Sequence, residues 1–441
     1  MTTTPSEAAD VPELAFVDGR LHWHGIDVAA ITANLSTPFF LISEARIAGN
    51  IASIRNGFHE AGLDATIRYC AKTNCELAVL EITREAGTDL LVAHIDEGEI
   101  ALRAGFSPRS LAFQKPVLTS ADARWVVSNE IGMVHVASSS DVERLEHAAA
   151  EARSVVPVSI RVRDELAPAF TPLGFFTRRL GIASRETVRL ARRIAGSEWL
   201  ELRALNCYIG THQGGTAKFA KAIDLLCKLV ATLANEGIPI HEINLGGGIP
   251  SPGTMKRNRG RVAPTSGIGS LRGFAHALGT LCLETMRRHE ITPTLKIAVE
   301  PGRAIVGDAA LVVTRVDGVT GRWLYLDASR NFLGESPLFI RRRTLPLMKP
   351  AARERLHFLS GRTLNTLDVI DPFRKLASPL EGDLLAIADA GAYTLGRVTR
   401  YAGLTPAVHL LRSSGTLVPI RDAETFEEML RAMRSISDDD S

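Results

Sequence analysis

The chain has 441 residues, 45% of them hydrophobic and 23% charged, with a formal net charge of +2. This balance is ordinary for a globular protein and lacks the strong field of a nucleic-acid or membrane-surface binder. No apolar run reaches the length of a membrane span, and residues 1–13 lack a basic segment followed by an apolar one. Five scattered cysteines, none in a C-x-x-C pair, favour reduced thiols. We therefore expect a cytoplasmic protein.

Residues 1–36 form an N-terminal segment that we expect to pair with a C-terminal β domain. Residues 37–305 contain short β-rich runs that alternate with helical stretches. These runs are apolar for most of their length, as in strands buried on both faces, and lie at 66–72, 89–93, 110–114, 133–137, 156–162, 203–209, 242–246 and 296–300. The alternation predicts an α/β fold, a (β/α)8 TIM barrel.

After residue 305 the β-rich runs follow one another across short turns. This pattern predicts a mostly-β domain over residues 306–441. The last stretch, 425–436, opens with a T-x-x-E capping box made of Thr425 and Glu428. We expect a terminal helix there, packed on the β domain.

Four features fall at the C-terminal ends of predicted barrel strands, where barrels of this type carry their active sites. Each has a plain explanation on its own, such as a strand-end lysine with its amine in water or a tight glycine turn. Together they suggest pyridoxal phosphate: a lysine for the aldehyde, glycine N–H groups for the phosphate and an acid for the pyridine nitrogen. They are Lys72, the segment "NCYIGTH" (206–212), the glycines Gly246, Gly247 and Gly248, and "VEPGR" (299–303).

These segments resemble motifs of one family. "YCAKTN" (69–74), "INLGGGIP" (243–250), "VEPGR" (299–303) and "EGDLLAIADAGAYT" (381–394) are similar to motifs of the fold-type III pyridoxal-phosphate decarboxylases, which include diaminopimelate, ornithine and arginine decarboxylases. The resemblance runs from "STPFFLIS" (36–43) to Gly403. It implies an alanine-racemase-like barrel with pyridoxal 5'-phosphate on Lys72. It also implies an amino-acid substrate decarboxylated at Cα through an external aldimine and quinonoid, in a homodimer with shared active sites.

The resemblance also implies roles for individual residues. Glu300 would face the ring nitrogen, with Gly302 beside it. The glycine turn and Tyr393 would bind the phosphate, and Arg303 would lie near phosphate or substrate. Tyr208 stands where the family has a ring-stacking histidine. His212, four residues on, either takes over that role, binds substrate or is an ordinary loop histidine.

The segment "GRTLNTLD" (361–368) departs from the family pattern. Leu364 replaces the cysteine that helps protonate the product across the dimer interface, and Asn365 replaces an acidic neighbour, while Asp368 remains. Leu364 cannot donate a proton. Either another group reprotonates Cα, with Lys72 as one candidate, or the outcome differs. The alternatives are an amino-acid racemase or epimerase, another Cα-carbanion reaction, or a catalytically silent homologue that binds the cofactor.

The segment "GESPLFIRRR" (334–343) departs as well. Diaminopimelate decarboxylases resemble R-x-x-L-Y here, whereas this chain has Glu335 and Phe339. A carboxylate at this place would repel an acidic tail and favour an amine, unless Glu335 is a solvated loop residue. We therefore expect a substrate other than diaminopimelate. Residues 250–270, rich in Pro, Gly and Ser, form either a lid or an insertion.

Overall fold

The computed structural model describes residues 14–163, 180–211, 213–252, 269–292, 294–334, 342–349, 353–401, 403–431 and 433–434. The chain divides into two compact units. One unit is Asn50–Ile305, and the other combines Met1–Gly49 with Val306–Ser441. Glu335, Phe339 and His212 lie outside the described residues, as does most of the segment 250–270.

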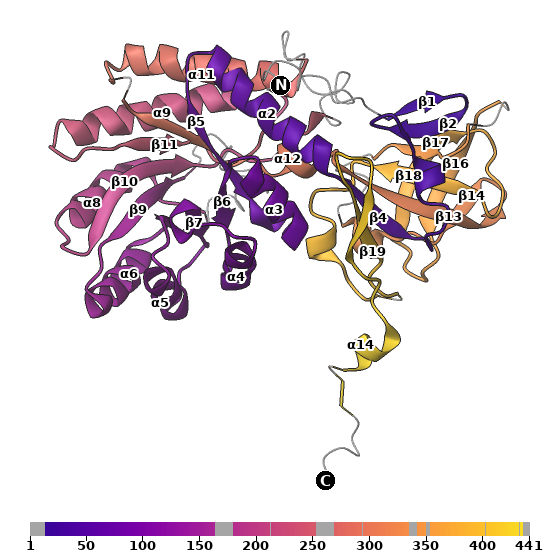
Figure 1. Cartoon of the computed structure of the whole chain (residues 1–441). Coiled ribbons are helices and arrows are strands. Elements are labelled where there is room, and N and C mark those ends of the chain that lie inside the picture. Colours follow the sequence, from indigo (N-terminus) through magenta and orange to yellow (C-terminus); the bar gives the residue numbers. More distant parts are fainter. Residues whose placement is uncertain are drawn as a thin grey trace. The chain divides into compact units, whose positions relative to one another are not determined.

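The first unit is built on a closed barrel of eight parallel strands (Figure 1). The barrel closes because β12 pairs with β5. Each predicted strand overlaps one of them, so the predicted (β/α)8 barrel is confirmed. The strands are β5 (Ala65–Cys70), β6 (Asp89–Val92), β7 (Leu111–Gln114), β8 (Met133–Val136), β9 (Val156–Val162), β10 (Leu200–Cys207), β11 (Glu242–Asn244) and β12 (Lys296–Val299).

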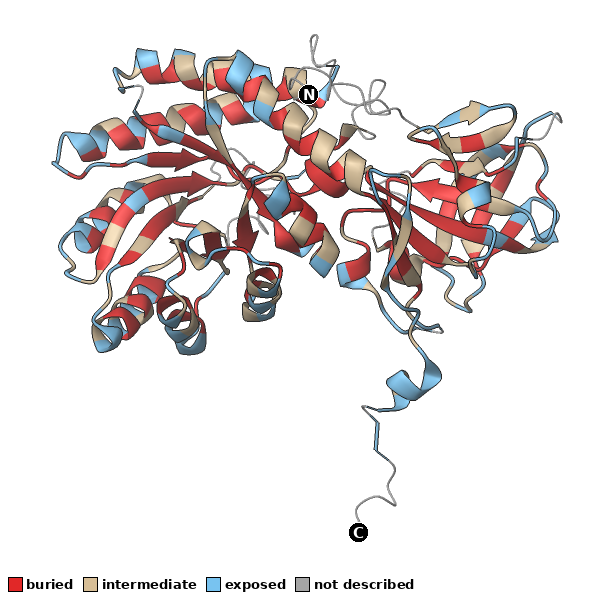
Figure 2. Ribbon diagram, in the orientation of Figure 1, coloured by how far each residue is buried: buried red, intermediate tan, exposed pale blue. Residues whose placement is uncertain are grey.

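Helices surround the barrel, with buried faces toward the strands and exposed faces outside (Figure 2). Helix α6 (Ser139–Ala152) shows why they form. The Ser138 side chain caps its first turn, and Val142, Leu145 and Ala149 are buried at helical spacing. The others are α3 (Leu77–Glu85), α4 (Ile95–Arg103), α5 (Ser120–Ser128), α8 (Ser184–Ala195), α9 (Ala217–Ala234) and α11 (Leu271–Arg288). Helices α2 (Glu44–Glu60) and α12 (Arg303–Val306) carry the chain between the two units.

The second unit is mostly β, as predicted. Its main sheet has the strand order β17-β16-β14-β13-β4-β19-β20, and β18 pairs with both β13 and β15. The strands are β4 (Phe39–Ser43), β13 (Ala310–Thr320), β14 (Trp323–Leu326), β15 (Thr344–Pro346), β16 (Arg355–Gly361), β17 (Val369–Leu376), β18 (Leu384–Ala388), β19 (Ala407–Leu411) and β20 (Leu417–Arg421). Two short helices, α1 (Val28–Ile31) and α13 (Arg330–Leu333), belong to this unit.

The N-terminal segment forms a three-stranded sheet within the second unit. Its strands are β1 (Ala15–Val17), β2 (Arg20–Trp23) and β3 (Ile26–Asp27). The N–H of Leu21 donates to the carbonyl of Leu347 at 2.9 Å. Leu21 and Trp23 are buried in one core with residues of β4, β13 and β18. The apolar faces of segments far apart in the sequence therefore cover one another.

Two sequence expectations differ from the structure. Strand β4 (Phe39–Ser43), placed with the barrel over 37–305, instead pairs with β13 and β19 in the second unit. A strand that is buried on both faces has the same apolar sequence pattern in either sheet. The predicted terminal helix forms, but the expectation that it packs on the β domain is wrong. Helix α14 (Phe426–Leu430) forms with its capping box but has no buried residue, because a cap fixes where a helix starts and not what covers it.

Among the described residues, no helix is both long and apolar enough to cross a bilayer.

Candidate active site

The turn that carries Lys72 packs against the loop after β12. Lys72 lies exposed in a single 3-10 turn, Ala71–Thr73, directly after β5. The N–H of Cys70 donates to the carbonyl of Pro301 at 3.3 Å. A Cβ on Gly302 would lie 2.0 Å from Oγ1 of Thr73. Only glycine at 302 lets the two loops approach this closely, so the structure explains Gly302 by packing.

Glu300 follows β12 and points into the barrel, where it is 5% exposed. Its Oε1 accepts a hydrogen bond from Nδ2 of Asn244 at 2.6 Å and lies 3.3 Å from Nε2 of His135. Burial raises the pKa of Glu300, but the nearby His135, with Arg68 and Asn244, outweighs burial and holds the pKa below its usual range. Glu300 is therefore an ionised carboxylate. None of the described residues bonds to its second oxygen, Oε2.

The glycine turn after β11 is built from close backbone contacts. Gly246 and Gly248 have φ angles of +63° and +101°. A Cβ on Gly247 would lie 2.9 Å from the carbonyl oxygen of Glu300, and one on Gly248 would lie 2.4 Å from that of Gly210. The N–H of Glu300 donates to the carbonyl of Gly246 at 2.8 Å, which joins this turn to the Glu300 loop.

The same turn offers backbone donors. Gly247 and Gly248 are partly accessible. Within the described part of the chain, no group accepts a hydrogen bond from the N–H of either glycine. Two adjacent N–H groups of this kind suit an anion.

Tyr208 lies beside the glycine turn, just after β10. A Cβ on Gly247 would lie 3.7 Å from Cε2 of the tyrosine. The guanidinium carbon of Arg161, on β9, lies 5.8 Å from the centroid of the Tyr208 ring, in a cation–π contact. This contact fixes the tyrosine ring next to the turn.

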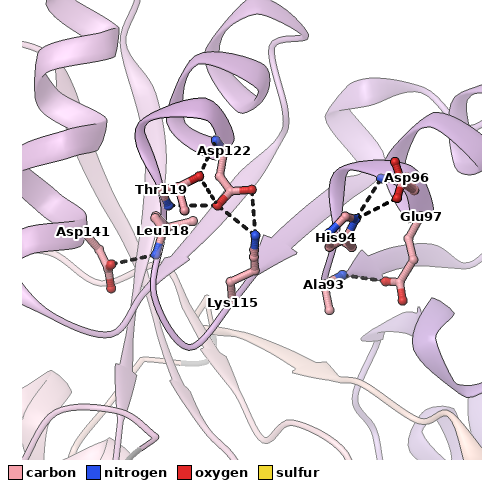
Figure 3. Close-up of polar contacts among 9 residues, drawn as sticks. All are labelled: Ala93, His94, Asp96, Glu97, Lys115, Leu118, Thr119, Asp122 and Asp141. Carbon is pink, nitrogen blue, oxygen red and sulfur yellow. Dashed lines mark hydrogen bonds and ion pairs between the residues drawn. The ribbon is translucent and has the colours of Figure 1, made fainter. Parts of the chain in front are cut away.

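Carboxylates hold the loops that follow β6 and β7 (Figure 3). Nζ of Lys115 donates to both oxygens of Asp122 at 2.9 Å, and Asp122 also accepts from the backbone and hydroxyl of Thr119. In the neighbouring loop, the N–H of Ala93 donates to Glu97 at 2.7 Å. These bonds satisfy partly buried backbone donors and hold the two loops at this end of the barrel.

Two titratable groups lie close enough to Lys72 to respond to its charge. Burial raises the pKa of Glu97, while the N–H of Ala93 and the Lys72 ammonium oppose this rise. Burial likewise raises the pKa of the Cys70 thiol to about 11, again against the charge of Lys72. The Lys72 ammonium is therefore a positive charge close to both Cys70 and Glu97.

In the second unit, Tyr393 has a left-handed backbone, with φ +56°. An aromatic residue in this region is an outlier that persists only where its surroundings impose it. A Cβ on Gly334 would lie 2.2 Å from the carbonyl oxygen of Tyr393, so Gly334 makes room for this conformation. Such local strain is common at functional sites.

The loop Gly361–Asp368 combines a rigid base with an exposed tip. The Asp368 carboxylate accepts hydrogen bonds from the N–H of Arg330 at 2.8 Å, the Thr363 hydroxyl at 2.6 Å and the Ser329 hydroxyl at 3.2 Å. The Asn365 side chain accepts from the N–H of Leu367 at 3.0 Å. Leu364 is 98% exposed. Asp368 thus holds the loop, and its contact with substrate stays a prediction.

Comparison with known proteins assigns the family. Residues 45–307 match the family model described as pyridoxal-dependent decarboxylase, pyridoxal binding domain. The chain belongs to the pyridoxal-dependent decarboxylases. The resemblance of the chain to this family is confirmed.

Relatives of this decarboxylase cover nearly its whole length. It is 28% identical to a diaminopimelate decarboxylase of Pseudomonas aeruginosa, over 94% of this chain and 97% of the relative. The structure of the M. jannaschii diaminopimelate decarboxylase in complex with L-lysine matches with a TM-score of 0.87 at 21% identity, covering 98% of this chain and 99% of that one. A lysine/ornithine decarboxylase from Vibrio vulnificus, complexed with putrescine, matches with a TM-score of 0.71 at 20% identity, covering 88% and 98%.

The cofactor of this decarboxylase family is pyridoxal 5'-phosphate (PLP). The described residues fit this group. The glycine turn has no room for a Cβ, and no residue that the structure describes accepts from its N–H groups at 247 and 248 or bonds to Oε2 of Glu300. An ionised carboxylate is the group that a protonated pyridine nitrogen requires.

Sequence reasoning missed three residues of this decarboxylase site: His135, Arg161 and Asn244. Each is a polar side chain in a barrel strand: His135 and Arg161 interrupt mostly apolar runs, and Asn244 ends the buried strand β11, which also contains Glu242. That interruption was a signal, because a polar residue in such a strand needs a partner. The identity of the partner depends on which strands become neighbours.

Proposed function

We propose that this decarboxylase removes the α-carboxylate of an amino acid other than diaminopimelate, with PLP held by Lys72. The observation that carries the proposal is the direct connection of three loops at one end of the barrel. The N–H of Cys70, just before the Lys72 turn, donates to the carbonyl of Pro301, and the N–H of Glu300 donates to that of Gly246. These contacts support a site in which an amine, a carboxylate and the N–H donors of the glycine turn serve one cofactor.

When bound, PLP supplies an electron-accepting ring that takes up the electron pair left at Cα as CO2 departs. The residues of the chain orient and polarise that ring. Oε2 of Glu300 would accept the hydrogen bond of the pyridine N–H, and its ionised state keeps that proton in place. The N–H groups of Gly247 and Gly248 would bind the phosphate, with Arg303 and Tyr393 as further predicted ligands. The ring of Tyr208, fixed by Arg161, would flank the cofactor.

A proton must reach Cα after CO2 leaves. Leu364, which stands at the position of the family cysteine, has no proton to give. The Lys72 amine is exposed beside Glu97 and Cys70 and is our candidate donor. The Cys70 thiol, with a pKa of about 11, stays neutral at working pH.

The choice of substrate rests on the sequence. Glu335 and Phe339 occupy the places where diaminopimelate decarboxylases resemble R-x-x-L-Y, and a carboxylate there disfavours an acidic tail. We expect an amino acid whose side chain ends in an amine or guanidine. A relative at 28% identity is a diaminopimelate decarboxylase. Diaminopimelate is therefore the main alternative substrate, and the test includes it.

The proposed dimer is motivated by the loop Gly361–Asp368. Leu364 and Leu367 are 98% and 65% exposed in one chain, while the base of their loop is rigid. Exposed leucines on a rigid loop suit a protein interface. We propose that a second copy of the chain covers them, which agrees with the shared active sites that the family resemblance implies.

Absorption spectroscopy and CO2 release test the proposal. The protein reconstituted with PLP should show a visible band that borohydride abolishes and that Lys72→Ala lacks. A panel of meso-diaminopimelate, lysine, ornithine and arginine should then give CO2 release with a basic amino acid. Exchange of the Cα hydrogen without CO2 release would instead identify a racemase, the alternative that Leu364 motivates. A band that no amino acid perturbs would contradict both.

A further inference from the structure

A buried histidine stands behind the carboxylate that faces the cofactor site. His135 lies in β8, between strands β7 and β9, and is 0% exposed. Its Nε2 is 3.3 Å from Oε1 of Glu300, at the distance of an ion pair. The fully buried histidine therefore has an ionised carboxylate as its charged neighbour.

The same carboxylate oxygen is also held by an oriented amide. Oδ1 of Asn244 accepts the N–H of Gly246 at 2.8 Å, so its Nδ2 must point the other way, toward Oε1 of Glu300 at 2.6 Å. Asn244 thus donates a hydrogen bond to one oxygen of Glu300, and His135 lies beside the same oxygen at ion-pair distance. Oε2 has no hydrogen-bond partner among the described residues, which leaves it for a ligand.

We propose that His135 is a positioning residue that holds Glu300 ionised and turned toward the pyridine nitrogen of PLP. This inference rests on the proposed function. A carboxylate that became protonated could no longer accept the pyridinium proton. Without a partner, a carboxylate buried as deeply as Glu300 would become easier to protonate, because burial alone raises its pKa. Arg68 contributes a more distant charge with the same effect.

The alternative is that His135 simply fills the barrel interior. A substitution would then disturb cofactor binding whatever residue stood at 300. If His135 acts through Glu300, its substitution matters only while the carboxylate is present. A double-mutant cycle separates these two cases.

The experiment measures the PLP dissociation constant of apoprotein by equilibrium dialysis in a double-mutant cycle of His135→Leu and Glu300→Gln. We expect His135→Leu to weaken binding about 10-fold or more in the wild-type background, as for a lost contact to a buried charge. In the Glu300→Gln background it should change binding less than about twofold, because no carboxylate remains to be held. Ser159→Ala is the matched control, since Ser159 lies opposite His135 on β9 and does not bond to Glu300.

Equal losses in both backgrounds, an unchanged dissociation constant for His135→Leu, or an equal loss for Ser159→Ala would each overturn the inference. If circular dichroism shows that His135→Leu does not fold, His135→Asn enters the same cycle, since its shorter side chain withdraws from Glu300. Wild-type protein that binds no PLP would refute the proposed function itself. Wild-type binding with a persistent His135 effect in the Glu300→Gln background refutes only the role of His135.

Discussion

Gly302 and Thr73 lie in contact between the neighbouring loops that follow β12 and β5. The Cβ position of the glycine would fall 2.0 Å from Oγ1 of the threonine, nearer than any real contact. The loop that presents Lys72 and the loop that presents Glu300 are therefore fitted to one another through a missing side chain.

Gly302→Ala should force these loops apart. We expect the PLP dissociation constant to rise about tenfold or more, as for an overpacked site that costs 1–3 kcal/mol. Equilibrium dialysis measures the affinity, and thermal unfolding of apoprotein measures the stability. Gly318→Ala is the control, because a Cβ there meets nothing within 4 Å. Thr73→Ala should restore part of the loss in the double variant, and the absence of any restoration would contradict the contact.

Glu300 should leave a signature in the pH dependence of stability. Its pKa is lowered in the folded protein, so its contribution is complete above the ordinary value of 4.5 and is lost as the pH falls through the lower folded value. The free energy of unfolding of wild-type apoprotein should therefore fall more steeply below about pH 4.5 than that of Glu300→Gln. Urea unfolding at successive pH values measures both. Parallel curves would show that the carboxylate is not held as we describe.

The buried ion pair of Arg68 and Glu242 should be costly to break. The two side chains bond at 2.7 and 2.8 Å and are 8% and 9% exposed. Glu242→Ala leaves the Arg68 charge buried, and we expect it to reduce the free energy of unfolding by about 3–5 kcal/mol. The double variant Arg68→Met, Glu242→Leu removes both charges and should lose less. A double variant that is less stable than Glu242→Ala would contradict this account.

Leu364→Asp should weaken the proposed dimer. A charge buried in an interface without a partner is unfavourable, so we expect the dimer dissociation constant to rise about tenfold or more. Sedimentation velocity over a range of protein concentrations measures it. The control is Leu380→Asp, a change at another leucine that is 70% exposed. A wild-type protein that stays monomeric at all concentrations would refute the dimer itself.

The barrel was predictable because two signals in the sequence locate its strands. Runs such as "DLLVA" (89–93) are apolar on both faces, and helical periodicity separates one run from the next. Strand β4 is also an apolar run, and its local sequence does not distinguish a barrel strand from a strand in the centre of another sheet. Its neighbours, β13 and β19, lie hundreds of residues away in sequence.

The candidate site was predictable only where the chain carries a motif. Lys72, the glycine turn and Glu300 each sit in a recognisable segment, and their loops are in contact. His135 and Asn244 sit in no motif. Their importance arises from the closure of the barrel, which brings β8, β11 and the end of β12 around one carboxylate.

Asp368 separates the part of the loop Gly361–Asp368 that anchors it from the residue at its tip. Its carboxylate accepts hydrogen bonds from Arg330, Thr363 and Ser329, and a Cβ on Gly361 would lie only 2.2 Å from it. The hydrogen bonds that anchor the loop thus lie at its base, while Leu364 at the tip is 98% exposed in the single chain. The residue at 364 can therefore change to a thiol, an acid or an aliphatic side chain while the Asp368 anchor is kept. The chemistry offered at the tip of this loop can thus change without a change in the fold.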